Sequence, residues 1–338
     1  MVTIITPTYN HSSYIVDCVN SVRAQEFQDW EQIIVDDGST DETWERILEL
    51  AAEEPRIRPF RVPHMGIWRL DSVYNYALDR ARGDLVAILE GDDLWPINKL
   101  TIQLPYHQGN PIFSYGLVNA VGRGRSESVG RPAVEGSVAS TDFLHEIALG
   151  RETVHSSSLI IDREALNSIG GFKQLGYFAV DLPTLLELGK LKGEIIFVDR
   201  MLGFWRQHEG QTTQAFDSST DDMGNVSHRL QTLERGWKLR EQIIEERPSL
   251  GIRLSDIRKA RDRSISAWCL VVLDNYFADH VNPSPSISLL ARTMMRRGNV
   301  LRKAEGVWAL LCNKSSINYR FPYSLFEKTG SLARRVFQ

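Results

Sequence analysis

The sequence predicts an α/β protein in which a mostly parallel sheet has helices on both faces and is followed by an α-helical region. Three observations support this fold class. Strand-like segments alternate with segments whose apolar residues recur at helical spacing. The strand-like segments are continuous apolar runs, as expected where both faces of a sheet are covered. From Asp222 onward only helical patterns occur.

In chain order, the first strand covers residues 2–6, is rich in β-branched residues and ends at Pro7. Further strands are predicted at residues 33–35, 57–62 and 85–89. A helix is predicted between each pair of successive strands, and the last of these helices, at residues 70–82, ends at Gly83. Later strands are predicted at residues 112–121, 158–161, 195–198 and 202–205, and short helices at residues 99–103, 141–149, 163–169 and 181–188.

The helical region begins with an apolar stripe that includes Leu230 and Trp237, and further helices are predicted at residues 255–278, 286–296, 299–312 and 324–337. We therefore expect a domain of residues 1–215, with a nucleotide-binding part (1–100) and an acceptor part (101–215). Residues 216–338 would form the helical C-terminal region.

Charge is distributed unevenly along the 338 residues. Residues 1–222 contain 19 Lys and Arg against 33 Asp and Glu, whereas residues 223–338 contain 20 against 10. A basic region beside an acidic body favours an anionic surface or polymer as a partner, and the alternative is a solvated basic helix face. We expect no nucleic-acid partner.

Cysteine spacing and hydropathy indicate the cellular compartment of the protein. Cys18, Cys269 and Cys312 have neither zinc spacing nor a disulfide pattern, which predicts a reducing environment. No leader pattern precedes the first strand, and no apolar run approaches the ~18 residues that span a bilayer. We expect a cytoplasmic protein, with a peripheral position at the inner face of the membrane as a further option.

Asp92 and Asp93 directly follow the buried strand at residues 85–89, after the turn at Gly91. Adjacent carboxylates repel each other, so a buried pair needs a cation. Carboxylate oxygens suit Mg²⁺ or Mn²⁺, and substrate phosphates commonly complete the coordination of such ions. The alternative is a solvated turn in which an Asp caps a helix.

Polar clusters follow three strands: residues 7–10, residues 36–37 and residues 92–93. Because the carboxyl ends of parallel strands share one edge of a sheet, we expect a single crevice there. It suits a nucleoside diphosphate, with Tyr9 stacking, Asp37 accepting hydrogen bonds from base or ribose, and a cation bridging the phosphates. Glycine-rich phosphate loops are missing after the first strand, which disfavours P-loop and dinucleotide-binding folds.

Five motifs lie within roughly the first 210 residues: Pro7-Thr-Tyr-Asn10, Val35-Asp-Asp-Gly-Ser-Thr-Asp41, Ala81-Arg-Gly-Asp84, Gly91-Asp-Asp-Leu-Trp-Pro96 with Lys99-Leu100, and Gly170-Gly-Phe172. In this order they resemble the motifs of the inverting family 2 glycosyltransferases, which have the GT-A fold. The resemblance implies donor-nucleotide contacts from Pro7, Thr8, Tyr9 and Asp37. It also implies that Asp92 and Asp93 serve the ribose and the divalent ion, with Glu90 in place of the family's usual first aspartate.

The resemblance implies Asp181 as the catalytic base, since the family has a Glu-Asp pair at this helix start. Here Val180 stands in place of the Glu. The base would remove the acceptor's hydroxyl proton while the sugar's C1 is attacked opposite the leaving nucleotide. The alternative is that Asp181 is only a helix N-cap.

Other residues have implied roles with open alternatives. Arg69 lies roughly where relatives place a basic residue near the diphosphate; a surface salt bridge is the alternative. Arg206-Gln-His208 resembles the family's Arg-x-His turn, so His208 is a metal ligand or diphosphate contact, or else a neutral surface histidine. Trp95, Trp205 and Arg206 are expected at the sugar or acceptor pocket, although Trp is as often simple packing. We expect His11, His64 and His155 to be structural.

Together these features predict a metal-dependent inverting glycosyltransferase with Mg²⁺ or Mn²⁺. It would move a sugar from a nucleotide-sugar donor, most simply a UDP-sugar, to a glycan or lipid-linked acceptor in cell-surface polysaccharide synthesis. The alternatives are a catalytically silent GT-A-fold glycan-binding or scaffold protein and a sugar nucleotidyltransferase. The basic C-terminal helices, for example around Arg292 and Arg296, predict peripheral membrane contact.

Overall fold

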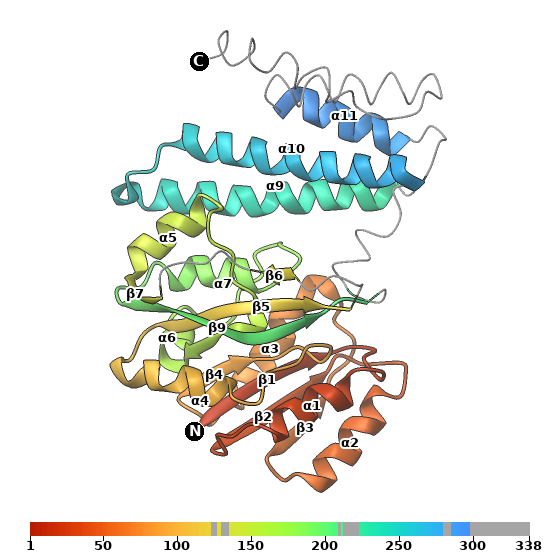
Figure 1. The fold of residues 1–338 in the computed structure, drawn as a ribbon, viewed down its shortest axis with the longest axis vertical. Helices are drawn as coiled ribbons and strands as arrows, with labels where there is room; N and C mark the ends of the chain where they lie inside the picture. The colour runs from red at the N-terminus through yellow and green to blue at the C-terminus, as the bar shows by residue number, and fades with distance from the viewer. Residues whose placement is uncertain (123–126, 130–134, 209–210, 212–222, 280–284, 298–338) are drawn as a thin grey trace. The chain divides into compact units, whose positions relative to one another are not determined.

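The computed structural model describes residues 1–122, 127–129, 135–208, 211, 223–279 and 285–297 (Figure 1). The chain divides into two compact units. The first consists of Met1–Thr212 and Arg235–Ile257, and the second of Thr213–Glu234 and Arg258–Gln338. The predicted helices at 299–312 and 324–337, and Cys312, lie outside the described residues.

Nine strands of the described chain form one sheet in the order β3-β2-β1-β4-β8-β5-β9-β7, with β6 paired to β5. The first four are mutually parallel: β3 (Ile57–Arg61), β2 (Trp30–Asp36), β1 (Val2–Thr8) and β4 (Leu85–Ile88). The others are β8 (Ile160–Asp162), β5 (Phe113–Val121), β9 (Glu194–Arg206), β7 (Gly136–Ala139) and β6 (Glu127–Val129). Strand β9 runs parallel to β5, while β8, β7 and β6 pair antiparallel with their neighbours.

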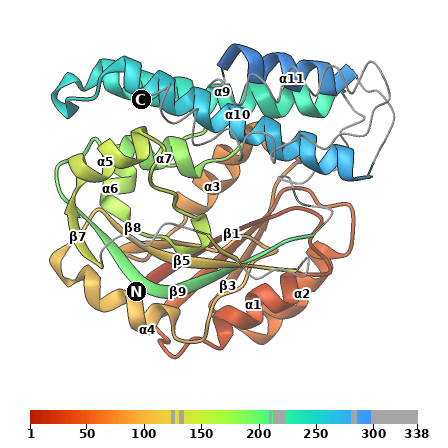
Figure 2. The same ribbon diagram turned by 45° about the horizontal axis from the view of Figure 1, so that its top comes forward.

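Helices cover both faces of the sheet, as Figures 1 and 2 show. On one face, α1 (Ile15–Arg23), α2 (Thr43–Glu53) and α4 (Lys99–Gln103) pack on β-strand residues such as Ile4, Ile34 and Ala87. On the other face, α3 (Leu70–Leu78), α5 (Ser140–Ala148), α6 (Arg163–Ser168) and α7 (Asp181–Leu188) share a core with Ile5 and Ile33. Short 3₁₀ turns are Ile67–Arg69, η2 (Leu104–Gly109), Ser156–Ser158 and Pro248–Leu250.

The helical region contains α9 (Met223–Glu246), α10 (Leu254–Asp279) and α11 (Pro285–Arg297). Leu239 and Ile243, in the second half of α9, belong to the core cluster of the first unit. The predicted domain division at residue 215 stays a prediction, and these contacts add residues 235–257 to the first compact unit. Among the described helices, none combines the length and the apolar composition that crossing a bilayer requires.

The predicted α/β class, with a largely parallel sheet covered on both faces and a helical C-terminal region, is confirmed. Three details of the prediction differ from the structure. Helix α3 ends at Leu78, before Gly83, and strands β6 and β7 were not predicted. The strands predicted at 195–198 and 202–205 are a single strand, β9, which continues through Asp199 and Arg200. Its pairing with β5 has register shifts between Gly116 and Val118. This β-bulge accommodates the exposed residues Asp199 and Arg200 within the strand.

Candidate active site

The predicted polar clusters lie side by side at the carboxyl ends of neighbouring strands. Thr8, the last residue of β1, is in register with Asp36 of β2. The adjacency continues beyond the strands, because Asp37 N donates to Thr8 O (2.9 Å) and Gly91 N donates to Pro7 O (3.0 Å). The loops that carry Tyr9, Asp37 and Asp92 therefore meet at one edge of the sheet.

Asp37 is 4% exposed and sits against the loop that follows β3. Its Oδ1 accepts a hydrogen bond from Met65 N (2.8 Å), and its Oδ2 accepts one from Gly66 N (3.2 Å) and lies 3.0 Å from His64 Nδ1. The His64 ring stacks on Tyr9, with ring centroids 4.1 Å apart. Tyr9 is 37% exposed, so this corner offers an aromatic face beside a carboxylate.

Asp92 joins two imidazoles in a group that could hold a metal ion: one ligand atom each from His11, Asp92 and His208 lies within 4.8 Å of the others. His208 Nε2 is 3.1 Å from Asp92 Oδ2, and His11 Nε2 is 3.9 Å from the same oxygen. Burial would raise the pKa of Asp92, but the hydrogen bond to His208 and the charges of both histidines outweigh it and lower the pKa. Burial lowers the pKa of His11, partly offset by Asp92, which favours its neutral, metal-binding form.

The donor set fits a divalent cation, because imidazole nitrogens and a carboxylate oxygen are ordinary ligands of such ions. Asp93, also predicted as a ligand, is not in this group. It is fully buried, and its Oδ1 accepts a hydrogen bond from Arg206 N (3.0 Å). Burial and the charges of Asp92 and Glu90 raise its pKa well above the usual value.

Asp181, at the start of α7, is electrostatically part of the same site. Burial raises its pKa, while the backbone hydrogen bond from Leu182 and the charge of Arg240 oppose the rise. Asp181 helps to raise the pKa of Glu90 to about 7, after burial and Asp92, and the Tyr74 hydroxyl donates to Glu90 Oε1 (2.5 Å). Burial raises the pKa of Tyr74 well above its usual value, and the charges of Glu90, Asp181 and Asp92 raise it further.

Three other residues predicted for the site, Arg69, Arg206 and Trp205, differ in solvent exposure and in their contacts. Arg69 is exposed and donates to Ser72 Oγ, and no ion pair of Arg69 occurs among the described residues. Arg206 pairs with Asp17 (3.3 Å) and lies over the Tyr14 ring. Half-buried Trp205 packs against His155, with centroids 5.4 Å apart.

Trp95 has a different environment from the one expected. It is 4% exposed, belongs to a hydrophobic core cluster and donates from Nε1 to Ser157 O (2.7 Å). The packing alternative therefore describes Trp95, and we do not propose it as a pocket residue.

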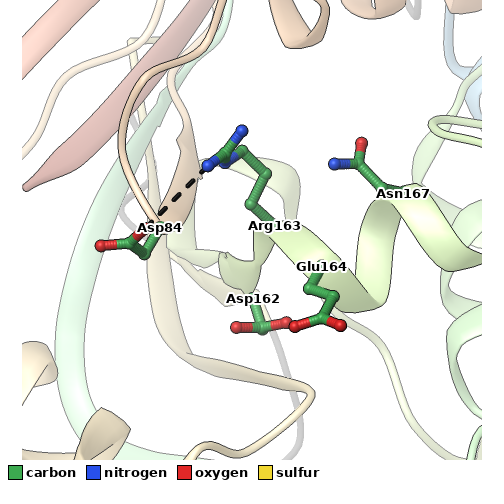
Figure 3. Close-up of a pocket in the computed structure, with 5 residues that line it drawn as sticks. All are labelled: Asp84, Asp162, Arg163, Glu164 and Asn167. Atoms are coloured by element: carbon green, nitrogen blue, oxygen red, sulfur yellow. Dashed lines mark ion pairs between the residues drawn. The ribbon is translucent and has the colours of Figure 1, made fainter.

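A separate surface pocket of about 330 Å³ lies at the opposite end of β4 (Figure 3). It is lined by Asp84, Asp162, Arg163, Glu164 and Asn167. Asp84 immediately precedes β4, and Asp162 pairs with the first residue of that strand. The pocket is therefore distinct from the edge where Asp92 lies.

Sequence reasoning did not find His11 or Tyr74 as site residues. The signal for His11 was available, because it follows residues 7–10 at the end of β1, the same sheet edge as Asp92. Tyr74 lies inside α3, outside every motif that the sequence analysis named.

Known proteins with similar sequences include glycosyltransferases. The family model described as "Glycosyl transferase family 2" matches residues 3–169. TuaG of Bacillus subtilis, named a putative teichuronic acid biosynthesis glycosyltransferase, is 32% identical over 170 residues, or 50% of this chain and 65% of TuaG. WfgD of Escherichia coli, a UDP-Glc:alpha-D-GlcNAc-diphosphoundecaprenol beta-1,3-glucosyltransferase, is 30% identical over 168 residues, or 49% of this chain and 62% of WfgD. The matches thus span less than two thirds of these relatives.

Solved structures share the fold at low identity. S. aureus TarS 1–349 in complex with UDP-GlcNAc gives a TM-score of 0.54 at 17% identity, covering 93% of this chain and 88% of that one. The mannosyltransferase PcManGT from Pyrobaculum calidifontis, in complex with GDP-Man and Mn²⁺, gives 0.50 at 19% identity, covering 93% and 87%. With the GT-A architecture and the match over residues 3–169, this part of the chain belongs to glycosyl transferase family 2.

Proposed function

We propose that this protein transfers a sugar from a nucleotide-diphosphate donor to a hydroxyl group, with inversion at C1. The observation that supports this most strongly is the meeting of two groups at one sheet edge, the Tyr9–Asp37 corner and the His11–Asp92–His208 group, with Asp181 close enough to help raise the pKa of Glu90. Family membership supplies the reaction class.

Each group has a role in this proposal. Tyr9 and Asp37 bind the nucleoside, with backbone support from Pro7 and Thr8, and exposed Arg69 contacts the diphosphate. Asp92 and His208 would hold a divalent cation, which when bound offsets the charge of the departing diphosphate. Asp181 accepts the acceptor's hydroxyl proton on its carboxylate, and the half-buried Trp205 and Arg206 border the sugar or acceptor.

The donor and acceptor classes are inferred from similar proteins. WfgD is named for a UDP-Glc donor and a diphosphoundecaprenol-linked acceptor, and TarS has been solved with UDP-GlcNAc. We therefore propose a UDP-sugar donor and a glycan or lipid-linked acceptor, in cell-surface polysaccharide synthesis on the cytoplasmic side of the membrane.

A thermal-shift screen of UDP-, GDP- and dTDP-sugars with Mn²⁺ tests donor binding first. We expect UDP-sugars to raise the melting temperature most, and the preferred donor to be turned over with release of UDP. The anomeric configuration of the product, read by NMR, should be opposite to that of the donor. Donor binding without any turnover, for wild type and Asp181→Asn alike, would favour a silent glycan-binding protein instead.

A further inference from the structure

We propose that His11 is a third protein ligand of the divalent cation, and that the resulting set of two imidazoles and one carboxylate makes the site prefer Mn²⁺ and Co²⁺ to Mg²⁺. The proposal rests on the proposed function, since it concerns the same cation site. It adds a ligand that the sequence motifs did not indicate and a metal preference that they left open.

The three side chains come from three different strand ends and converge. His11 follows β1, Asp92 follows β4 and His208 follows β9. Both Nε2 atoms approach the same carboxylate oxygen of Asp92, at 3.9 Å and 3.1 Å. Ligands bound to one ion at about 2.1 Å lie about 3 to 4.3 Å apart, so small side-chain shifts bring all three into one coordination shell.

The imidazole rings of His11 and His208 are edge-to-face rather than stacked. Their planes are 89° apart, with centroids 6.1 Å apart. The ring of Tyr14 lies 4.2 Å from that of His208 and restricts its orientation.

A hydrogen bond orients His11 for binding through Nε2. Its Nδ1 lies 3.1 Å from Thr8 Oγ1, and donation from Nδ1–H to Thr8 leaves the Nε2 lone pair facing Asp92. Gly91 leaves room for this pair: a Cβ there would collide with Thr8 Oγ1 and lie 3.0 Å from His11 Nδ1. The backbone around Asp92 is thus shaped to admit His11.

A set of two imidazole nitrogens and one carboxylate oxygen favours some divalent metals over others. Mg²⁺ prefers oxygen ligands and keeps several waters, whereas imidazole nitrogens bind first-row transition ions more strongly. The competing description is that His11 is only an ion-pair partner of Asp92. In that case a bound metal would have at most one imidazole ligand.

Metal binding to the full-length chain, freed of metal with chelator, tests the proposal without any sugar donor. Calorimetry with Mn²⁺ and with Mg²⁺ gives the preference, and pulsed EPR of bound Mn²⁺ gives the number of coordinated imidazole nitrogens. We expect two nitrogens in the wild type and one in His11→Gln, with Mn²⁺ affinity reduced about tenfold or more. His145→Gln, a histidine on α5 paired with Glu146, is the matched control and should change neither quantity.

Two nitrogens retained in His11→Gln, or equal affinity for Mg²⁺ and Mn²⁺ in the wild type, would overturn the proposal. If His11→Gln does not fold, His208→Gln decides: one remaining nitrogen supports His11 as a ligand, and none rejects it. Failure of transfer with every nucleotide sugar contradicts the proposed function but leaves the nitrogen count unaffected, so the two failures are distinguishable.

Discussion

Asp181 is the catalytic base in the proposed function, and burial raises its pKa. Its raised pKa means that the carboxyl stays protonated to higher pH than an ordinary Asp, and a general base acts only when deprotonated. We expect kcat/KM for transfer to fall as pH is lowered through this raised pKa. Asp181→Asn should lose about 10²- to 10⁴-fold in kcat together with this acid limb.

The pH–rate profile and UDP affinity, measured on the same preparations, check this prediction. The exposed Asp199→Asn is the control and should keep both the rate and the limb. A loss of UDP binding in Asp181→Asn as large as its loss of turnover would assign Asp181 a structural role.

Gly91 is a residue whose missing side chain matters. A Cβ at this position would overlap Thr8 and crowd His11, whereas at Gly109 it would meet nothing within 4 Å. We expect Gly91→Ala to lower the free energy of unfolding by about 1–3 kcal/mol and to weaken Mn²⁺ binding. Urea unfolding and calorimetry measure both, with Gly109→Ala as the matched control; equal behaviour of the two variants would contradict the close contact.

Among the elements, the 3₁₀ turn η2 contributes pH-dependent stability through His107. This histidine is 8% exposed and its Nε2 lies 2.6 Å from Ser114 Oγ on β5. Burial and the charge of Lys99 lower its pKa to about 4 from 6.5. Between these values the unfolded chain binds more protons than the folded one, so the free energy of unfolding falls as pH drops from 6.5 toward about 4.

We therefore expect His107→Gln to flatten this part of the stability curve, measured by urea unfolding at a series of pH values. A slope remains, because burial also lowers the pKa of His155 to about 4. An equally steep curve in His107→Gln would show that this histidine is not held neutral.

For the molecule as a whole, the helical region is not simply an appendage. Leu239 and Ile243 of α9 are buried in the core of the first unit, and Arg240 donates from Nε to Ile147 O (3.0 Å). Burying each such aliphatic side chain contributes about 1.5–3 kcal/mol to the free energy of unfolding. We expect a chain ending at residue 222 to melt well below one ending at residue 257, by calorimetry.

Deleting the helical region therefore tests stability as well as any local role of these helices. Removing everything after residue 222 would also remove part of the core, so lost nucleotide binding would not report on a local role. Identical melting of the two truncated chains would contradict the contribution of residues 235–257 to the first unit.

The second unit carries a basic helix face. On α11, Leu290, Ala291 and Met294 are buried, whereas Arg292 and Arg296 are exposed. We propose that membrane contact, if made here, is electrostatic: binding to anionic vesicles should fall steeply with added salt, and Arg292→Glu with Arg296→Glu should weaken it. Vesicle co-sedimentation measures this, and equal binding to neutral phosphatidylcholine vesicles would contradict it.

Hydrophobic runs and polar residues after strands predicted much of this architecture. Continuous apolar runs predicted buried strands, and Asp37 and Asp92 at strand ends predicted one shared crevice, because the edge of a parallel sheet gathers whatever follows its strands. The pairing of β9 with β5 across Asp199 and Arg200 was missed, since exposed polar residues in a bulged strand look like a turn in sequence.

The sequence by itself determined the fold class, the family and the sheet edge that holds the site, because all three follow from periodicity and motif order. Only the tertiary structure decided which side chains meet there. It turns Asp93 toward the backbone of Arg206, buries Trp95, and brings His11 beside Asp92. The direction of a side chain after a turn depends on neighbours distant in the chain, such as Thr8 for His11 and Ser157 for Trp95.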